Sequence, residues 1–212
     1  MTAYVCVHGH AYQPPRESPD TGEVERQPSA DPFHDWNERV TSECYAPLSQ
    51  AKRLDEHGST LSVTNLWEHL SFDLGPTLGV WMDRRVPGVA TSIAVGDSTG
   101  GGAMAHPWVH AILPLTPPGD RATIVRWGVD EFRARYGRAP LGMWLPETAV
   151  DTASLEALAE GGDQHRHRCG TGHDRVDILV ADAVEVEVVA RLQAGGNPDE
   201  RGRDGVAHGG EL

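Results

Sequence analysis

The sequence predicts an α/β fold with a parallel sheet in its first 161 residues, followed by a poorly structured tail. In the first part, β-rich apolar runs alternate with segments of helical period, and this alternation is typical of parallel sheets. The second observation is a break in composition, because all thirteen Phe, Tyr and Trp residues lie at or before Trp144. We therefore divide the chain into residues 1–161 and a tail, residues 162–212.

Each element follows from a local pattern. Three β-rich runs predict strands, at Tyr4–His8, Thr60–Thr64 and Leu141–Leu145. Helical spacing predicts four helices, at Trp36–His57 with an interruption near Pro47, Thr77–Arg84, Ala122–Tyr136 and Thr152–Glu160. Gly137 is a stop signal for the third helix and Asp151 an N-cap for the fourth. The segment Ile93–Ala105 is ambiguous, because three consecutive glycines break it.

The tail has few residues that can build a core. It is rich in Arg, His, Gly and Asp, and such a segment buries too little apolar area to offset its chain entropy. Only Val176–Leu192 offers a packing face, as a strand or, from Val180, as a helix. The chain holds a single Lys beside its many Arg, which indicates GC-rich coding DNA. We expect the tail to be a divergent or frameshifted segment.

Charge and composition exclude several classes of partner. The net charge of −13 provides no footprint for nucleic acid or an anionic membrane. No apolar run reaches the length of a membrane span, and the start has no leader signature. Three widely spaced cysteines, Cys6, Cys44 and Cys169, fit reduced thiols. We expect a cytoplasmic protein, for which neutral sugars are suitable partners.

A carboxylate that follows the predicted strand Leu141–Leu145 is the first candidate for chemistry. Glu147 lies in the turn at the carboxyl end of this strand, and in parallel α/β barrels that end carries the catalytic residues. Trp144 offers an aromatic face on which a sugar ring can stack. The alternative interpretation is an exposed loop Glu or a helix cap.

Two histidines follow the first predicted strand. His8 and His10, at positions i and i+2 of an extended segment, point the same way and suit either a metal ion or two hydroxyls of one sugar. Gln13 lies in the same turn. The alternative is a pair of histidines in a polar loop. Glu68, after the second predicted strand, is a weaker candidate that also fits an ordinary helix-start Glu.

Five separated segments occur in an order that resembles glycoside hydrolase family 57, in particular bacterial members with a domain of unknown function after the catalytic domain. The similarity covers about residues 3–161. It is carried by His8-Gly9-His10-Ala11-Tyr12-Gln13-Pro14-Pro15-Arg16-Glu17, His34-Asp35-Trp36-Asn37-Glu38-Arg39, Ser71-Phe72-Asp73-Leu74-Gly75-Pro76-Thr77-Leu78, His110-Ala111-Ile112-Leu113-Pro114-Leu115 and Tyr136-Gly137-Arg138-Ala139-Pro140-Leu141-Gly142-Met143-Trp144-Leu145-Pro146-Glu147-Thr148. At Asp73 the chain departs from the family, in which Asn is expected.

The resemblance implies the N-terminal part of a (β/α)7-type barrel that acts on α-glucans by a retaining mechanism, without metal or cofactor. Glu147 matches the nucleophile. The resemblance and the local patterns together give the following wall residues of a sugar cleft: His8, His10, Gln13, Glu68, His110 and Trp144. Retention needs a second carboxyl group about 5–5.5 Å from the first, and nothing after Gly161 resembles the family motif that supplies it.

The resulting hypothesis is a glycoside hydrolase or glucanotransferase-like fragment that is weakly active or inactive. A (β/α) barrel needs roughly 200–250 residues, so the barrel is incomplete. Two alternatives remain open. One is a metal-dependent barrel amidohydrolase, which can begin with two histidines after its first strand. The other is a non-catalytic α-glucan-binding module, which needs no general acid.

Overall fold

The computed structural model describes residues 7–163, 175–180 and 188–193, and its centre is a sheet of parallel strands. The strands are β1 (His8–Ala11), β4 (Ser71–Leu74), β5 (Ala103–Met104) and β6 (Gly142–Trp144). β4 lies between β1 and β5. A parallel bridge between Ala105 and Met143 attaches β6 beside β5. Spatial order therefore follows chain order, as in successive βα units, and the predicted α/β class is confirmed.

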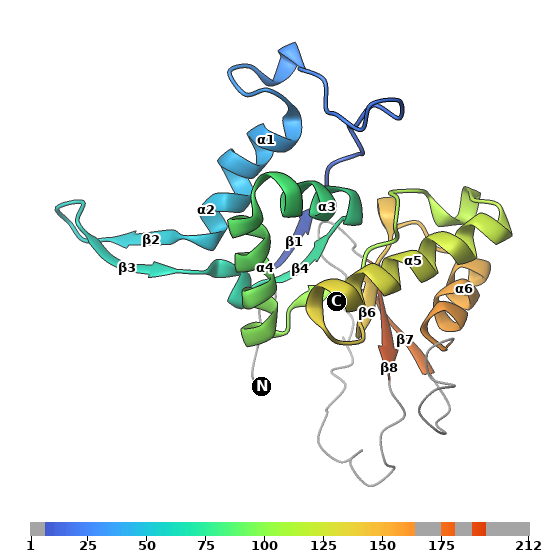
Figure 1. The fold of residues 1–212 in the computed structure, drawn as a ribbon. Coiled ribbons are helices and arrows are strands. Elements are labelled where there is room, and N and C mark those ends of the chain that lie inside the picture. Colours follow the sequence, from blue (N-terminus) through green and yellow to red (C-terminus); the bar gives the residue numbers. More distant parts are fainter. Residues whose placement is uncertain (1–6, 164–174, 181–187, 194–212) are drawn as a thin grey trace, which may run out of the picture.

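The helices connect these strands and pack on one another in chain order (Figure 1). α3 (Pro76–Arg85) and α4 (Pro87–Gly100) join β4 to β5, α5 (Pro118–Tyr136) joins β5 to β6, and α6 (Thr152–Asp163) follows β6. Sheet and helices share one core, whose fully buried members include Phe72, Ile93, Phe132 and Leu158. Across the described ranges, no helix has the length and apolar character that a bilayer crossing requires.

The connection from β1 to β4 differs from the prediction. It contains the helical turns Pro28–Ala30, α1 (Trp36–Val40), Thr41–Tyr45 and α2 (Ala46–Ser49), then the hairpin of β2 (Ala51–Leu54) and β3 (Thr60–Thr64), and last the turn Leu66–Glu68. Figure 1 shows the hairpin projecting from the body.

Two predictions for this connection were wrong. The helix expected up to His57 ends at Ser49, and the strand at Thr60–Thr64 pairs antiparallel with β2 instead of joining the parallel sheet. The cause is a tight turn. The Asp55 carboxylate accepts hydrogen bonds from the backbone N–H groups of His57 and Ser59, and Gly58 has a φ of 82°. This turn chemistry returns the chain on itself.

Other local predictions are confirmed. Gly137 ends α5 in the left-handed conformation, with a φ of 68°. Asp151 accepts a hydrogen bond from the backbone N–H of Ser154 at 2.7 Å and so caps α6. The ambiguous segment is helical up to Gly100, and Gly101 ends α4 with a φ of 67° before β5 begins. The first described strand is β1, His8–Ala11, and residues 4–6 of the strand predicted at Tyr4–His8 lie outside the described residues.

Two further strands lie in the tail. β7 (Arg175–Val180) and β8 (Val188–Gln193) pair antiparallel, and β8 also pairs antiparallel with β6. Strands therefore occur at both ends of the predicted segment Val176–Leu192, and its middle, residues 181–187, lies outside the described residues. The prediction of a poorly structured tail falls otherwise on residues 164–174, 181–187 and 194–212, which lie outside the described residues.

Gly128 fixes how closely α5 approaches the segment after β5. A Cβ atom at Gly128 would overlap the His106 carbonyl oxygen and lie 3.0 Å from the Pro107 Cα. We predict that Gly128→Ala lowers the free energy of unfolding by about 1–3 kcal/mol, because backbone on both sides has to shift. Urea denaturation followed by circular dichroism measures this change.

The matched control is Gly119→Ala on the same helix, where an added Cβ atom meets nothing within 4 Å. Alanine is the better helix former by up to about 1 kcal/mol, so this variant should keep or gain stability. Equal losses in the two variants would contradict the close-approach explanation.

Candidate functional site

The candidate site lies at the carboxyl edge of the parallel sheet. His10 on β1 is the direct register partner of Asp73 on β4, and His106 follows β5 by two residues. Trp144 ends β6, and Glu147 follows it as predicted. Because parallel strands present their carboxyl ends at one edge, four strands bring these side chains together.

Asp73 is the buried centre of the site, with no exposed surface. One carboxylate oxygen lies 2.8 Å from His10 Nδ1, and the other lies 3.1 Å from His8 Nε2. His8 Nδ1 lies 2.9 Å from the Ser71 hydroxyl, which fixes that ring as well. Burial alone would raise the pKa of the Asp73 carboxyl, but the hydrogen bonds from the two imidazoles outweigh it and hold the pKa below its ordinary value.

A second chain of contacts runs from His106 to Glu147. His106 Nδ1 lies 2.6 Å from the Pro107 carbonyl oxygen, so this nitrogen must donate, and Nε2 carries the lone pair. Burial lowers the pKa of His106 to about 4, and the ring is therefore neutral. His106 Nε2 lies 3.4 Å from His110 Nδ1, and His110 Nε2 lies 3.2 Å from Glu147 Oε1.

The proton count of this chain constrains His110. Both of its ring nitrogens face acceptors, the His106 lone pair on one side and the Glu147 carboxylate on the other. A proton on Nε2 lets His110 donate to the Glu147 carboxylate, and this hydrogen bond holds the carboxylate in a fixed direction.

Glu147 combines an exposed carboxylate with a strained backbone. Its φ is 55° and its ψ is 21°, and Thr148 has a φ of 52°. Two consecutive non-glycine residues in the left-handed region are unusual, and such strain is concentrated at functional sites. The Glu147 side chain is 66% exposed, whereas His110 is 14% exposed. The turn therefore fixes the Glu147 backbone and exposes its carboxylate to solvent.

Aromatic rings line the same edge. Trp144 stacks on His10 with ring centroids 3.9 Å apart, and Tyr12 stacks on His110 at 4.1 Å. Trp144 is only 6% exposed, so its principal contact is the imidazole and little of its face is open to a sugar. Its indole Nε1 is buried without a hydrogen-bond partner among the described residues. Half-buried Tyr12 offers more accessible aromatic surface.

Two predicted wall residues lie apart from this cluster. The Gln13 side-chain oxygen accepts a hydrogen bond from Arg16 at 2.8 Å, within a polar network in the loop after β1. Glu68 precedes β4 and therefore lies toward its amino end, and its backbone packs closely on Gly100 of α4. Its expected position after a parallel strand was wrong, because the preceding strand belongs to the β2–β3 hairpin.

The sequence prediction missed Asp73, His106 and Tyr12 as members of the cluster. A signal existed for Asp73, because a carboxylate between Phe72 and Leu74 in a strand of an α/β sheet is a buried charge that needs partners. His106 follows a two-residue strand after a glycine run, and no periodic pattern marks it.

The same edge contains the residues that can hold a metal ion. His10, Asp73 and His106 each offer one ligand atom, and the three atoms lie within 4.8 Å of one another. Comparisons of the chain with protein-family models, curated proteins and solved structures gave no match. The assignment of function therefore depends on the geometry of the sheet edge and on the motifs in the sequence.

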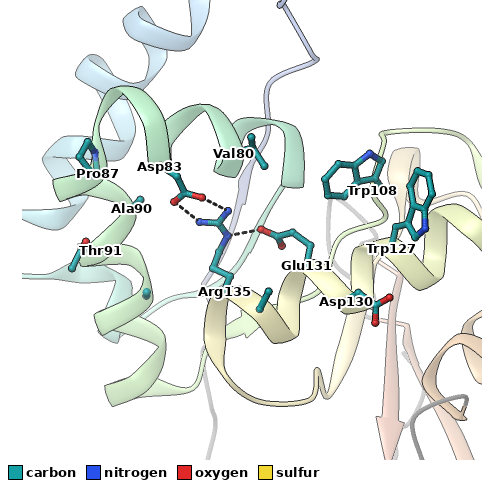
Figure 2. A pocket seen from close by; sticks show the side chains of 12 residues that line it. Val80, Asp83, Pro87, Ala90, Thr91, Trp108, Trp127, Asp130, Glu131 and Arg135 are labelled. Carbon is teal, nitrogen blue, oxygen red and sulfur yellow. Dashed lines mark hydrogen bonds and ion pairs between the residues drawn. The ribbon is translucent and has the colours of Figure 1, made fainter. Parts of the chain in front are cut away.

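A separate cavity of about 730 Å³ lies on the helical side of the molecule, among α3, α4 and α5 (Figure 2). Its polar groups bind one another: Arg135 pairs with Asp83 at 3.0 Å and with Glu131 at 2.6 Å. Trp108 and Trp127 meet at 88°, so they form no flat platform for a sugar ring. The sheet edge, where a carboxylate is exposed, is the better candidate for catalysis.

The strained turn yields a stability prediction. Thr148→Gly should raise the free energy of unfolding by a few tenths to about 1 kcal/mol, because glycine accepts a positive φ and releases strain of about 1–2 kcal/mol, less its larger unfolded-state entropy. Thermal denaturation measures the gain.

Thr116→Gly is the matched control. Thr116 has an ordinary φ of −89°, and its hydroxyl also donates to a backbone carbonyl, as that of Thr148 does. This variant should lose stability. A loss of the same size at Thr148 would show that the turn stores no strain.

Proposed function

We propose that this chain is the N-terminal part of a (β/α)7-type barrel that acts on α-glucans by a retaining mechanism, with Glu147 as the nucleophile. One observation carries the proposal: a strained turn at the carboxyl edge of a parallel sheet holds an exposed carboxylate against a histidine. The motifs shared with family 57 supply the substrate class. Hydrolysis and glucan transfer begin with the same step.

In that step a Glu147 oxygen attacks the anomeric carbon, and the bond from this carbon to the leaving oxygen breaks, with its electron pair going to the leaving group. Water then attacks the glycosyl ester and restores the carboxylate. His110 donates to Oε1, which leaves the second oxygen of Glu147 available for attack. Because the Glu147 carboxylate is held in a fixed direction, its attack on the sugar costs less entropy.

The surrounding rings suit sugar hydroxyls. His10 Nδ1 binds Asp73, which leaves Nε2 as the ring nitrogen that a sugar hydroxyl can contact. Tyr12 adds an aromatic surface and a phenol group beside His110. In this arrangement His8 contributes indirectly, through its hydrogen bond to Asp73.

A retaining glycosidase also needs a general acid. Asp73 is unsuitable, because both of its oxygens accept hydrogen bonds from imidazoles and it has no proton to donate. Asp73 is the other carboxyl group of the cluster described above, so we place the proton donor outside the described part of the chain. This requirement makes activity depend on the leaving group of the substrate.

The nucleophile is tested with an α-glucosyl or α-maltosyl fluoride, whose leaving group needs little protonation. Glu147→Gln should lower turnover of this substrate by several orders of magnitude, because a neutral amide cannot form the glycosyl ester. A 5-fluoro glycosyl fluoride should label Glu147, and mass spectrometry of the digested protein would locate the label.

Glu156→Gln is the control, since Glu156 is an exposed carboxylate on α6. It should leave turnover and labelling unchanged. Full activity of the Glu147→Gln variant, or a label on another residue, would overturn the assignment.

The missing acid gives a second prediction. General acid catalysis contributes about 10²–10⁴-fold, so the chain should hydrolyse starch and maltooligosaccharides at least that much more slowly than the glycosyl fluoride. Reducing-end release and fluoride release measure the two rates under the same conditions. Comparable rates would mean that a carboxyl group in this chain supplies the proton.

The alternatives have distinct outcomes in these experiments. A non-catalytic α-glucan-binding module would bind maltooligosaccharides with equal affinity before and after Glu147→Gln and would hydrolyse no substrate. A metal-dependent hydrolase is favoured by a single observation, the His10, Asp73 and His106 cluster. Its activity would disappear on treatment with a chelator, whereas the nucleophilic mechanism would be unaffected.

A further inference from the structure

Two side chains from neighbouring strands and one from the segment after the next strand converge on one point at the sheet edge. His10 and Asp73 are register partners on β1 and β4, and His106 follows β5 in the same direction. Partners in a parallel ladder point to the same face, so the backbone places the three groups together without any loop rearrangement. One ligand atom from each of these three side chains lies within 4.8 Å of the other two.

Asp73 supplies the one anionic ligand among the three. The carboxylate is fully buried, and within the described ranges its hydrogen bonds come from imidazoles, with no Lys or Arg donating to it. A buried charge is costly unless it is paired or coordinates a metal.

His106 is oriented as a metal ligand. Its Nδ1–H donates to the Pro107 carbonyl oxygen at 2.6 Å, and the lone pair on Nε2 is directed away from that contact. A ring nitrogen that donates to a backbone carbonyl while the other one faces the ion is the usual outer support of a metal-binding histidine.

We propose that His10, Asp73 and His106 bind one divalent transition-metal ion of the zinc type, with a fourth coordination position open to the cleft. Two nitrogens and one oxygen suit Zn²⁺ or Co²⁺, whereas Ca²⁺ and Mg²⁺ prefer shells of oxygen atoms. Ligand atoms around a tetrahedral zinc ion lie about 3.4 Å apart, so each ligand atom has to move by less than about 1 Å.

An entry path exists on one side. The His10 side chain is 30% exposed, while Asp73 is buried and His106 is 2% exposed. The ion therefore reaches the site past His10, and Trp144 stacks on this ring and holds it in place. The proposal does not depend on glycosidase activity, because Glu147 is not one of the ligands.

The test uses the full chain after removal of metal with a chelator. Titration with Zn²⁺ against a chromophoric chelator should give one tight equivalent. His10→Gln, Asp73→Asn and His106→Gln should each weaken binding by more than the roughly 10–100-fold that loss of an outer hydrogen-bond partner costs. Thermal denaturation of each variant checks its folding, and His10→Gln, at an exposed ring, is the variant least able to disturb the core.

Three control variants test whether the ion binds at these ligands and nowhere else. His57→Gln, at a histidine exposed on the hairpin, should leave affinity unchanged. The double variant His165→Gln/His167→Gln removes imidazoles near Cys169 in the tail and should keep the tight equivalent. Glu147→Gln should also retain it, so a failure of the proposed nucleophile and a failure of the metal site are distinguishable.

The Co²⁺ form gives a readout on the unmodified chain. It should show visible d–d bands without the near-ultraviolet charge-transfer band of a cysteine ligand. Absence of a tight equivalent in the wild-type chain would overturn the proposal. The same holds for unchanged affinity in folded His10→Gln, for loss of the ion with the tail histidines, and for a thiolate band.

Discussion

The arrangement of the site depends on one buried carboxylate. Asp73 lies on β4, between β1 and β5, where water cannot solvate its charge. It is tolerable there only because His8 and His10 both direct ring nitrogens at it. This requirement explains the spacing of the two histidines: residues two apart on a strand share a face, and one carboxylate on the neighbouring strand can bind both. The fixed His10 ring then provides the surface on which Trp144 stacks.

A second set of contacts at the same edge links a buried histidine to an exposed carboxylate. His106 is buried and anchored to its own backbone, His110 is intermediate, and Glu147 reaches solvent. Side-chain exposure rises from His106 through His110 to Glu147. The backbone strain lies at the exposed end of this series, at Glu147 and Thr148. Strain of this kind persists only where neighbouring contacts hold the chain. Here the buried strand β6 on one side and the capped helix α6 on the other fix the ends of the turn.

Local signals in the sequence predicted what local physics decides. Gly137 ends α5 because glycine takes a positive φ, Asp151 caps α6 through its own side chain, and the strand before Glu147 is a short apolar run. The pairing of β3 was unpredictable in this way, since strand direction depends on a partner elsewhere in the chain. Glu68 was misplaced for the same reason.

The site residues also divide into those that a local signal marks and those that depend on distant contacts. His8, His10, His110, Trp144 and Glu147 were found because each stands in or next to a motif, and the structure brings them together. Asp73 binds histidines far away in the sequence, and its local signal was only that of a buried charge that needs partners, while no periodic pattern marks His106. His10 belongs to both proposed chemistries, as a contact for sugar hydroxyls and as the exposed metal ligand.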